Sequence, residues 1–270
     1  MTDLHPVVGA LGTSSERPAD RFRFLHVVHR NYLVWRQLLG SALVGHLADP
    51  LLWLVGFGFG IGSLLPTVGG LTYLEFLGSG MLCYSVMNSA SFEALYSAFT
   101  RLKHQRTWEG ILHAPMTVTD IVIGEWVWAG LKGALSGAAI LLVMAGLGLL
   151  KSFSALWLLP IVLLVGLAFS GIALVVTAVA KSYDMFTYYF SLFVMPMMLV
   201  SGVFFPAEQL PPIVRFTGEL FPLSHATALA RGLAVGAPLD HVVLHLAVIA
   251  IYAVLGLGLA NNLIKKRLTK

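Results

Sequence analysis

The stretch "TRLKHQRTWEGILHAPMTVTDIVIGEW" (Thr100–Trp126) carries more charge than any other interior part of the chain, and it lies between two long apolar runs. Hydrophobic residues make up 57% of the 270 residues and charged residues 11%, whereas an ordinary soluble domain has roughly 45–50% and about 25%. This composition indicates a membrane protein. One membrane-spanning helix needs roughly 20 apolar residues, so the chain has room for about six spans and for no soluble catalytic domain.

Six apolar runs are long enough to cross a bilayer, and they predict an all-α polytopic membrane protein. We expect a polar N-terminal tail at residues 1–20 with no removable signal peptide, a transmembrane domain at 41–264 and a basic tail at 265–270. Cys83 lies within an apolar run and is interpreted as a packing residue. The predicted spans are residues 42–65, 73–99, 119–150, 155–180, 185–205 and 239–264.

The basic residues predict the orientation of these spans. The segments on one side of the membrane contain only Lys151, Arg215 and Arg231, and Lys132 lies within a span. The segments on the other side hold the rest of the 17 lysines and arginines: Arg17, Arg21, Arg23, Arg30, Arg36, Arg101, Lys103, Arg106, Lys181, Lys265, Lys266, Arg267 and Lys270. Cytoplasmic segments carry the excess of basic residues, so both termini and the Thr100–Trp126 stretch are predicted to be cytoplasmic.

Residues 21–40 are predicted to form an amphipathic helix on the inner membrane surface. In "DRFRFLHVVHRNYLVWRQLL", Asp20 is placed as an N-cap, and an apolar stripe follows at helical spacing: Leu25, Val28, Tyr32, Trp35 and Leu39. A plain cytosolic extension of the first span is the alternative. The Asp49–Pro50 pair disfavours it because it interrupts the apolar run, and the aromatic stripe needs an apolar partner.

Residues 206–236, "PAEQLPPIVRFTGELFPLSHATALARGLAVG", are too broken by proline to span and too apolar for a free loop. We interpret them as two short helices that enter the outer leaflet partway, which requires their backbone groups to be covered by protein or water. An ordinary extracellular loop is the alternative.

The charged connector between the second and third spans is predicted to be a short cytoplasmic helix. Residues 101–113 are polar and rich in helix formers, and Pro115 ends them. Thr117 and Asp120 have the spacing of a capping box that starts the next helix. A helix clamped between two spans would transmit force from a soluble partner into the membrane. A solvated turn would carry the same charges, so the pattern alone leaves both interpretations open.

Glycine spacing indicates close helix contacts. The first span holds two overlapping G-x-x-x-G pairs, Gly56 with Gly60 and Gly58 with Gly62, and the third span holds Gly133 with Gly137. We assign the first span to a subunit interface and the third to packing within a subunit. The reverse assignment is the alternative, and glycine without a packing role is a further one.

Polar groups within the spans are candidates for a substrate path. Lys132 lies well inside the third span, and Glu93 and Glu125 are expected on the same inner-leaflet side. Lys132 is interpreted either as part of a structural pair or as a cavity group that meets an anionic or sugar head group. Hydroxyl, amide and aromatic groups in the second and fifth spans suit a glycan, with interhelical hydrogen bonds as the alternative: Ser85, Asn88, Ser89, Phe92, Tyr188, Tyr189 and Ser191.

Motifs for nucleotide or metal binding are not found. The chain contains no G-x-x-x-x-G-K-[ST] loop, so ATP must be handled by another chain. His241 and His245 have i, i+4 spacing but no H-E-x-x-H motif and no acidic third ligand nearby. We expect no catalytic residue, no cofactor or metal bound by this chain, and no nucleic-acid partner.

Four segments together resemble the ABC-2 family of ATP-binding-cassette exporter permeases, over about Arg21 to the C-terminus. They are the basic amphipathic helix, the first-span end "WLVGFGFGIG" with "YLEFLGSGML" after it, the connector "TWEGILHAPMTVTDIVIGEWVWAGLKG", and "LVSGVFFPAEQLPPIVRFTGELFPLSHATALARGL". The resemblance implies a homodimer of six-span subunits in the bacterial inner membrane, bound to two cytoplasmic ATPase subunits that hold ATP and Mg. It also implies a re-entrant outer hairpin and a coupling helix with the ATPase-facing residues Arg101, Lys103, Arg106, Trp108 and Glu109.

The expected function is that of a permease subunit that exports an amphiphile by alternating access. Permeases of the resembled family export lipo-oligosaccharides, polysaccharides or drugs, and we favour a lipo-oligosaccharide or similar glycolipid over a hydrophobic drug. A hypothesis of another class is an integral-membrane enzyme that uses Lys132, Glu93 and Glu125. The enzyme would turn over substrate as a purified chain, whereas the permease would need a nucleotide-binding partner.

The predicted orientation can be tested by cysteine labelling. With Cys83 replaced, single cysteines at Ser14, Ser152, Gln209 and Thr269 should react with a membrane-impermeant reagent in intact cells only at positions 152 and 209. The reason is that these two positions lie in the segments poor in lysine and arginine. Labelling at position 269 from outside would mean an odd number of spans.

Overall fold

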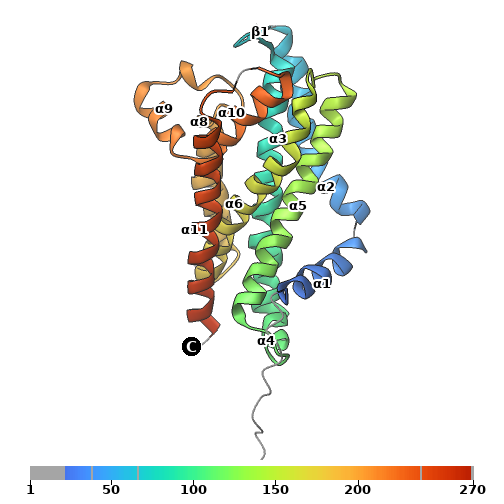
Figure 1. Cartoon of the computed structure of the whole chain (residues 1–270), viewed down its shortest axis with the longest axis vertical. Coiled ribbons are helices and arrows are strands. Elements are labelled where there is room, and N and C mark those ends of the chain that lie inside the picture. Colours follow the sequence, from blue (N-terminus) through green and yellow to red (C-terminus); the bar gives the residue numbers. More distant parts are fainter. Residues whose placement is uncertain (1–21, 38, 66, 238, 269–270) are drawn as a thin grey trace, which may run out of the picture.

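The computed structural model describes residues 22–37, 39–65, 67–237 and 239–268, and this part is almost entirely helical (Figure 1). Its strands are β1 (Thr67–Val68) and β2 (Leu71–Thr72), which have two residues each and pair antiparallel as a hairpin. The helices are α1 (Phe24–Arg36), α2 (Leu39–Gly60), α3 (Tyr73–Phe92), α4 (Thr107–Leu112), α5 (Val118–Gly146), α6 (Leu158–Val179), α7 (Asp184–Tyr188), α8 (Met195–Val200), α9 (Pro212–Glu219), α10 (Pro222–Val235) and α11 (Val242–Leu268).

Six helical segments run along the bundle, which confirms the all-α polytopic prediction. They are α2, α3 with the π turns after it, α5, α6, α7 joined to α8 through a π turn, and α11. Among the described residues, three helices are by themselves long and apolar enough to cross a membrane: Val118–Gly146, Phe153–Val179 and Val242–Leu268. Pro50–Ser63 and Asp184–Val200 are shorter apolar helices.

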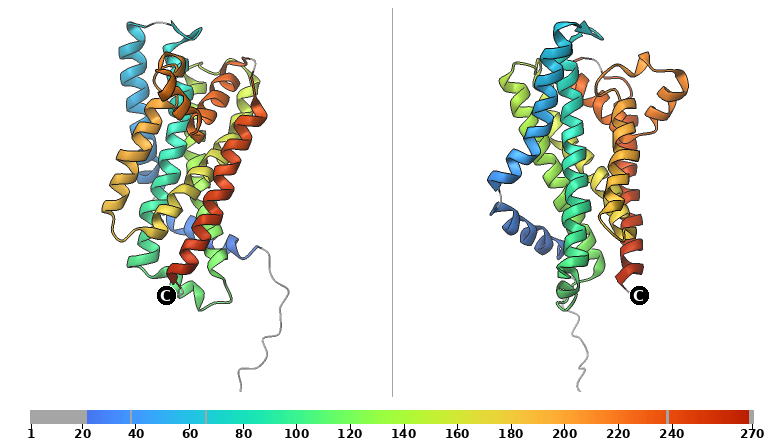
Figure 2. Two further views of the ribbon diagram at one scale, coloured as in Figure 1. Left: turned by 90° about the vertical axis from the view of Figure 1, so that its left-hand side faces the viewer. Right: turned by 180° about the vertical axis from the view of Figure 1, so that it is seen from behind.

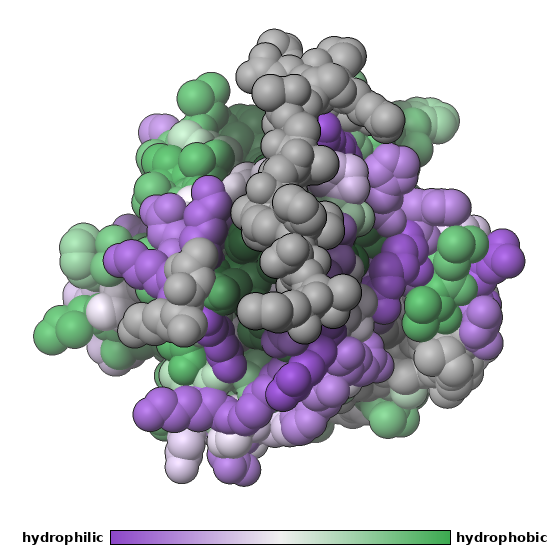
Figure 3. Space-filling view, turned by 90° about the horizontal axis from the view of Figure 1, so that it is seen from below, coloured by the Kyte–Doolittle hydropathy of each residue, from purple (hydrophilic) through white to green (hydrophobic). Residues whose placement is uncertain are grey.

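The bundle has two different ends. α1, α4 and the C-terminal end of α11 lie at the lower end in Figure 1, and the β-hairpin, α9 and α10 lie at the upper end. The basic residues Lys265, Lys266 and Arg267 end α11, so they share the lower end with the charged connector. Seen from below, hydrophilic side chains gather around this end (Figure 3). An even number of passes therefore brings the connector and the end of α11 to one side, as the distribution of basic residues predicted.

α1 is a separate helix that lies across the bundle instead of extending α2 (Figures 1 and 2). Its buried residues are Val27 and Asn31, whereas Leu25 and Tyr32 of the predicted stripe are exposed. Val27 fits here because Gly124 of α5 has no side chain, and a Cβ at Gly124 would lie 2.5 Å from Val27 Cβ. The face of α1 that meets the bundle is thus rotated about the helix axis relative to the predicted stripe. Asp20, the predicted N-cap, lies outside the described residues.

The connector is not the single helix predicted for residues 101–113. A π turn spans Thr100–His104, Arg106 then adopts a left-handed conformation with φ 48°, and α4 follows. A left-handed residue cannot continue a right-handed helix, so the chain changes direction at Arg106. The capping box is confirmed: Asp120 N donates to Thr117 Oγ1 over 3.2 Å, and Thr117 N donates to Asp120 Oδ2 over 2.8 Å.

The third-span glycines pack within the subunit, as predicted. A Cβ at Gly133 would lie 2.9 Å from the carbonyl oxygen of Val86, and one at Gly137 would lie 2.5 Å from Val86 Cγ2. Neither position has room for a side chain. These glycines allow α5 to approach α3 closely.

The two glycine pairs of α2 and its extension have different surroundings. A Cβ at Gly58 would lie 2.3 Å from Leu74, and one at Gly62 would lie 3.7 Å from Tyr73. Gly58 is buried and packs within the subunit, so its assignment to a subunit interface is wrong, whereas Gly62 is half-buried at ordinary contact distance and its assignment stays a prediction. Gly56 and Gly60 have no atom within 4 Å of such a Cβ, so their side of α2 is open.

The stretch before the last span forms the two predicted short helices, α9 and α10, each with a proline in its first turn. α10 packs against α3, α6 and α11 and buries Leu223, Ala226, Leu229 and Ala230. α9 instead exposes Ile213 and Phe216. The half formed by α10 is inserted into the upper end of the bundle and is not an ordinary loop.

Candidate functional site

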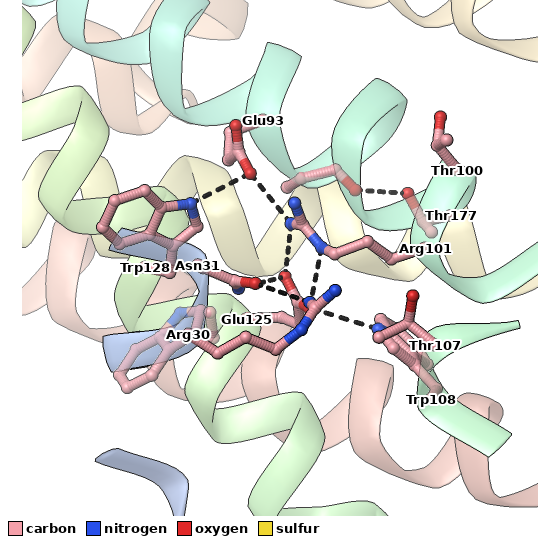
Figure 4. Close-up of polar contacts among 12 residues, drawn as sticks. Arg30, Asn31, Glu93, Thr100, Arg101, Thr107, Trp108, Glu125, Trp128 and Thr177 are labelled. Atoms are coloured by element: carbon pink, nitrogen blue, oxygen red, sulfur yellow. Dashed lines mark hydrogen bonds and ion pairs between the residues drawn. The ribbon is translucent and has the colours of Figure 1, made fainter. Parts of the chain in front are cut away.

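Four ionisable side chains form a buried charge network, which we define as Glu93, Arg101, Glu125 and Lys132. Figure 4 shows the first three of them. The guanidinium of Arg101 bridges the two carboxylates: Nη2 lies 2.8 Å from Glu93 Oε1 and 2.5 Å from Glu125 Oε2. Lys132 Nζ lies 2.7 Å from Glu93 Oε2. The expectation that Lys132, Glu93 and Glu125 lie on one side is confirmed, and Arg101 of the connector joins them.

All four carboxylate oxygens of the network accept hydrogen bonds. Besides the bonds from Arg101 and Lys132, Trp128 Nε1 donates to Glu93 Oε1 over 3.0 Å. Trp108 Nε1 donates to Glu125 Oε1 over 3.1 Å. A buried carboxylate needs both a counter-charge and hydrogen-bond donors. Both are present at Glu93 and Glu125, so the network is a satisfied structural unit.

The π turns position Glu93 and Arg101 on the same side of one helix. In a regular α-helix, residues eight positions apart differ in direction by about 80°. The π turns at Glu93–Ser97 and Thr100–His104 have wider turns and therefore rotate less per residue. The two side chains can consequently meet across eight positions and both face α5.

The surface helix α1 is joined to the network and to the connector. Asn31 Nδ2 donates to Glu125 Oε2 over 3.2 Å, and Arg30 Nη1 donates to Asn31 Oδ1 over 3.1 Å (Figure 4). Arg23 Nη1 donates to the carbonyl oxygen of Pro115 over 2.7 Å. Burial and then the charge of Arg101 lower the pKa of Arg30. α1 is therefore held at both the buried network and the end of the connector.

A second anchor holds the first half of the connector to the segment before α7. The hydroxyls of Thr100 and Tyr183 lie 2.7 Å apart, and the His104 ring stacks on Tyr183 at 5.4 Å between centroids. Lys103 Nζ donates to the carbonyl oxygen of Lys181. The connector is thus attached to α5 and α1 on one side and to the α6–α7 turn on the other.

A cavity of about 520 Å³ adjoins the network between α1, α3 and the connector. Its lining combines aromatic rings with charged groups: Arg30, Asn31, Val34, Trp35, Glu93, Tyr96, Ser97, Thr100, Arg101, Gln105, Trp128, Lys132 and Tyr183. Three of these residues are cationic and one is acidic. Rings beside hydrogen-bonding groups suit sugar rings, and the excess of positive charge suits an anionic group.

The predicted ATPase-facing residues divide into two groups. Trp108 is 0% exposed and bonded to Glu125, and Arg101 lies in the network, so the expectation that these two side chains present a docking surface is wrong. The indole of Trp108 and the guanidinium of Arg101 bind buried carboxylates instead. Lys103, Arg106 and Glu109 are exposed.

Three of the predicted substrate-path residues of the second and fifth spans form hydrogen bonds between helices. Ser85 Oγ lies 2.6 Å from Ser136 Oγ, Ser89 Oγ donates to Lys132 O over 3.3 Å, and the Tyr189 hydroxyl lies 3.0 Å from Ser91 Oγ. Ser85, Ser89 and Tyr189 are buried, so the interhelical alternative holds for these three. Asn88 is half-buried, and Tyr188 is 63% exposed on an apolar groove against α6 and α11.

Sequence reasoning missed Asn31, Trp128 and the role of Trp108. Asn31 is a polar residue among the apolar positions of α1, and this interruption was the signal available in the sequence. The structure shows that its side chain is buried. The rings of Trp35 and Trp128 also meet edge to face at 6.0 Å, which adds an aromatic contact between α1 and α5.

The family model described as ABC-2 type transporter matches residues 23–235, from the start of α1 to the end of α10. The chain belongs to the ABC-2 type transporter family. The match includes the network, the connector and both hairpin helices. The chain is therefore an ABC-2 permease, as the resemblance of the four segments indicated.

Similar proteins cover nearly the whole permease. Nodulation protein J of Rhizobium meliloti (strain 1021) is 41% identical over 251 residues, which are 93% of this chain and 96% of that protein. Nodulation protein J of Bradyrhizobium diazoefficiens is 41% identical over 259 residues, 96% and 99% of the two chains. The inner membrane transport permease YadH of Escherichia coli (strain K12) is 25% identical over 197 residues, 73% and 75% of the two chains.

The network predicts a strong coupling between Arg101 and Glu125. Glu125→Ala should destabilise the permease by about 3–5 kcal/mol because it leaves a buried cation short of a partner. The double variant Arg101→Ala/Glu125→Ala should lose less than the sum of the two single variants. Thermal unfolding in detergent measures both effects.

Arg215→Ala is the control, because Arg215 pairs with Glu219 at an exposed site on α9 and should contribute less than about 1 kcal/mol. If Glu125→Ala unfolded at the same temperature as Arg215→Ala, the network would not hold the connector.

Proposed function

We propose that this permease is the membrane subunit of an ATP-driven exporter and that the connector transmits movement of a cytoplasmic cassette ATPase into the bundle. The observation that carries the proposal is the junction at Arg101. One connector side chain bonds to carboxylates on the α3 extension and on α5, and α1 bonds to the same Glu125. A push on the connector would therefore move α1, α3 and α5 together.

The proposed ATPase contact is the exposed side of the connector. Arg106, Glu109, Gly110 and His113 are exposed at the lower end, while Trp108 and Leu102 point inward. Charged groups at a rim set register and specificity, and the buried side transmits the force. Two ATPase subunits would bind ATP and Mg, and both termini of the permease would lie in the cytoplasm of a bacterium, with the spans in its inner membrane.

A homodimer is proposed across the open side of α2. Gly56 and Gly60 lie there with the exposed side chains of Leu52, Val55 and Phe59. These residues follow the i, i+3, i+4, i+7 pattern of one helix face, and small residues within such a face allow two backbones to approach. Alternating access would then open and close the space between two copies.

The proposed substrate is an amphiphile, with a lipo-oligosaccharide or similar glycolipid favoured. The cavity beside the network supports this choice because it combines four aromatic residues, Trp35, Tyr96, Trp128 and Tyr183, with charged and hydroxyl groups. A purely hydrophobic drug would match this lining less well, because the cavity wall mixes aromatic rings with charged and hydroxyl groups. The resemblance to lipo-oligosaccharide permeases and the similarity to nodulation protein J point the same way.

An integral-membrane enzyme using Lys132, Glu93 and Glu125 is not supported. Each carboxylate oxygen already accepts a hydrogen bond or ion pair, and Lys132 Nζ is bound to Glu93. A general acid or base must reach the proton that it transfers. The two carboxylates and the Lys132 ammonium are instead bonded to other groups of the protein.

The coupling proposal predicts that charge reversal on the connector separates folding from transport. Glu109→Arg and Arg106→Glu should leave thermal stability unchanged, because both side chains are exposed, while they reduce ATPase co-purification and substrate-stimulated ATP hydrolysis. Arg215→Glu at the opposite end is the control and should change neither. Trp108→Ala should lower stability itself. Full transport and coupling in both connector variants would show that the connector is only a surface turn.

The dimer proposal predicts that bulk at two glycines weakens association. Gly56→Leu and Gly60→Leu should increase the monomer fraction in detergent and in nanodiscs, because the added side chains keep two α2 helices apart. Gly258→Leu on α11 is the matched control, since Gly258 is also helical, exposed and without neighbours within 4 Å. Equal dimer fractions in all three variants would place the interface elsewhere.

A further inference from the structure

The upper end of the bundle contains a cation that has no carboxylate within ion-pair distance among the described residues. Arg231 lies on α10, which packs against α3 near the β-hairpin (Figure 1). The two cations of the lower-end network, Arg101 and Lys132, are paired with carboxylates. At the upper end, even the exposed Lys151 is paired with Glu75, at 2.5 Å. Arg231 differs from all of them.

Neutral contacts hold the Arg231 side chain in place. Its guanidinium carbon lies 3.6 Å from the centroid of the Phe76 ring, and Nη2 donates to the carbonyl oxygen of Gly202 over 2.6 Å. Its Nε is buried and has no hydrogen-bond partner in the described part of the chain. A guanidinium has five N–H donors in a planar fork, and these contacts satisfy few of them. Glu208 interacts with this cation electrostatically but forms no ion pair with it, so part of its donor capacity is left unused.

A pocket of about 310 Å³ adjoins this side chain. Arg231 lies in its wall together with Gly69, Gly232, Asp240 and His245. Asp240 is exposed and is not within ion-pair distance of Arg231. The residues of this pocket belong to the β-hairpin, α10, the segment before α11 and the start of α11, which lie at the end of the bundle opposite the connector.

We propose that this outer pocket binds an oxyanion, such as the phosphate of a phospholipid head group or free phosphate, through Arg231. A planar guanidinium matches the geometry of a phosphate, and a charge-assisted bond compensates both the charge and the unused donors. The ring of Phe76 and the Gly202 carbonyl orient the fork before the anion arrives. The site is independent of the proposed ATPase contact, because it lies at the other end of the bundle.

The test measures thermal stabilisation of the delipidated permease, without any ATPase, by two probes. One is inorganic phosphate against chloride at equal ionic strength, and the other is a short-chain phosphatidylglycerol against an uncharged lipid of the same chain length. Stabilisation by both probes supports the site and identifies a general oxyanion pocket, whereas stabilisation by the phospholipid alone supports it and identifies a lipid head group. No stabilisation by either probe overturns the proposal.

Variants locate the effect at Arg231. Arg231→Gln should weaken the stabilising interaction about tenfold or more, since one charge-assisted bond is worth about 1.5–3 kcal/mol. Asp240→Asn should strengthen it a few-fold, because it removes a negative charge from the pocket at an exposed position that folding does not require. Arg215→Gln on α9 is the matched control and should bind as the parent does.

Arg231→Lys covers the case in which Arg231→Gln does not fold. The lysine keeps the charge but loses the planar fork, so binding several-fold weaker than in the parent is expected. If the Arg231 variant that folds and Asp240→Asn both bound the probes as the parent does, the assignment would be overturned. A failure of this test leaves the coupling proposal untouched, because charge reversal at Glu109 and Arg106 is measured through the ATPase.

Discussion

The arrangement of the lower end depends on two carboxylates that are buried between cations. Glu93 and Glu125 are 3% and 1% exposed, and an unpaired charge in such surroundings would cost several kcal/mol. Arg101 satisfies both carboxylates at once, and Lys132 completes the pairing at Glu93. The four charges lie on two segments, the α3 extension and α5, and Asn31 of α1 bonds to one of them. The cost of leaving any charge unpaired therefore restricts how these segments and α1 can be placed.

That restriction explains why the connector is suited to transmit force. A turn held only by its chain ends would yield under load, whereas this one is attached through Arg101 and Trp108 to α5 and through Thr100 and Lys103 to the segment around Tyr183. The left-handed residue Arg106 lies between Lys103 and Trp108, where the chain changes direction. The exposed residues of α4 are thus free for a partner while the buried ones carry the load inward.

The upper end is built on a different principle. α10 enters the bundle through close apolar packing, and Arg231 is held by an aromatic ring and a carbonyl oxygen in place of a carboxylate. The charge network is thus closed within the protein, whereas Arg231 is proposed to bind an external group. This difference fits the two proposals made above, an ATPase contact at the lower end and an oxyanion pocket at the upper end.

The sequence by itself determined the class of the protein, the helical spans, the separate α1, the two short helices near the C-terminus and the capping box at Thr117. These features depend on local hydropathy, proline and capping chemistry, which neighbouring residues specify. The sequence also grouped Lys132, Glu93 and Glu125, since helix length places them at similar depth. Only the tertiary structure decided that Arg101 and Trp108 turn inward, that Ser85 and Ser89 bond between helices, and that Gly58 packs inside while Gly56 stays open. The physical reason is that helical periodicity states which residues share a face but not which partner that face meets, and a charge or a glycine acquires its role from that partner.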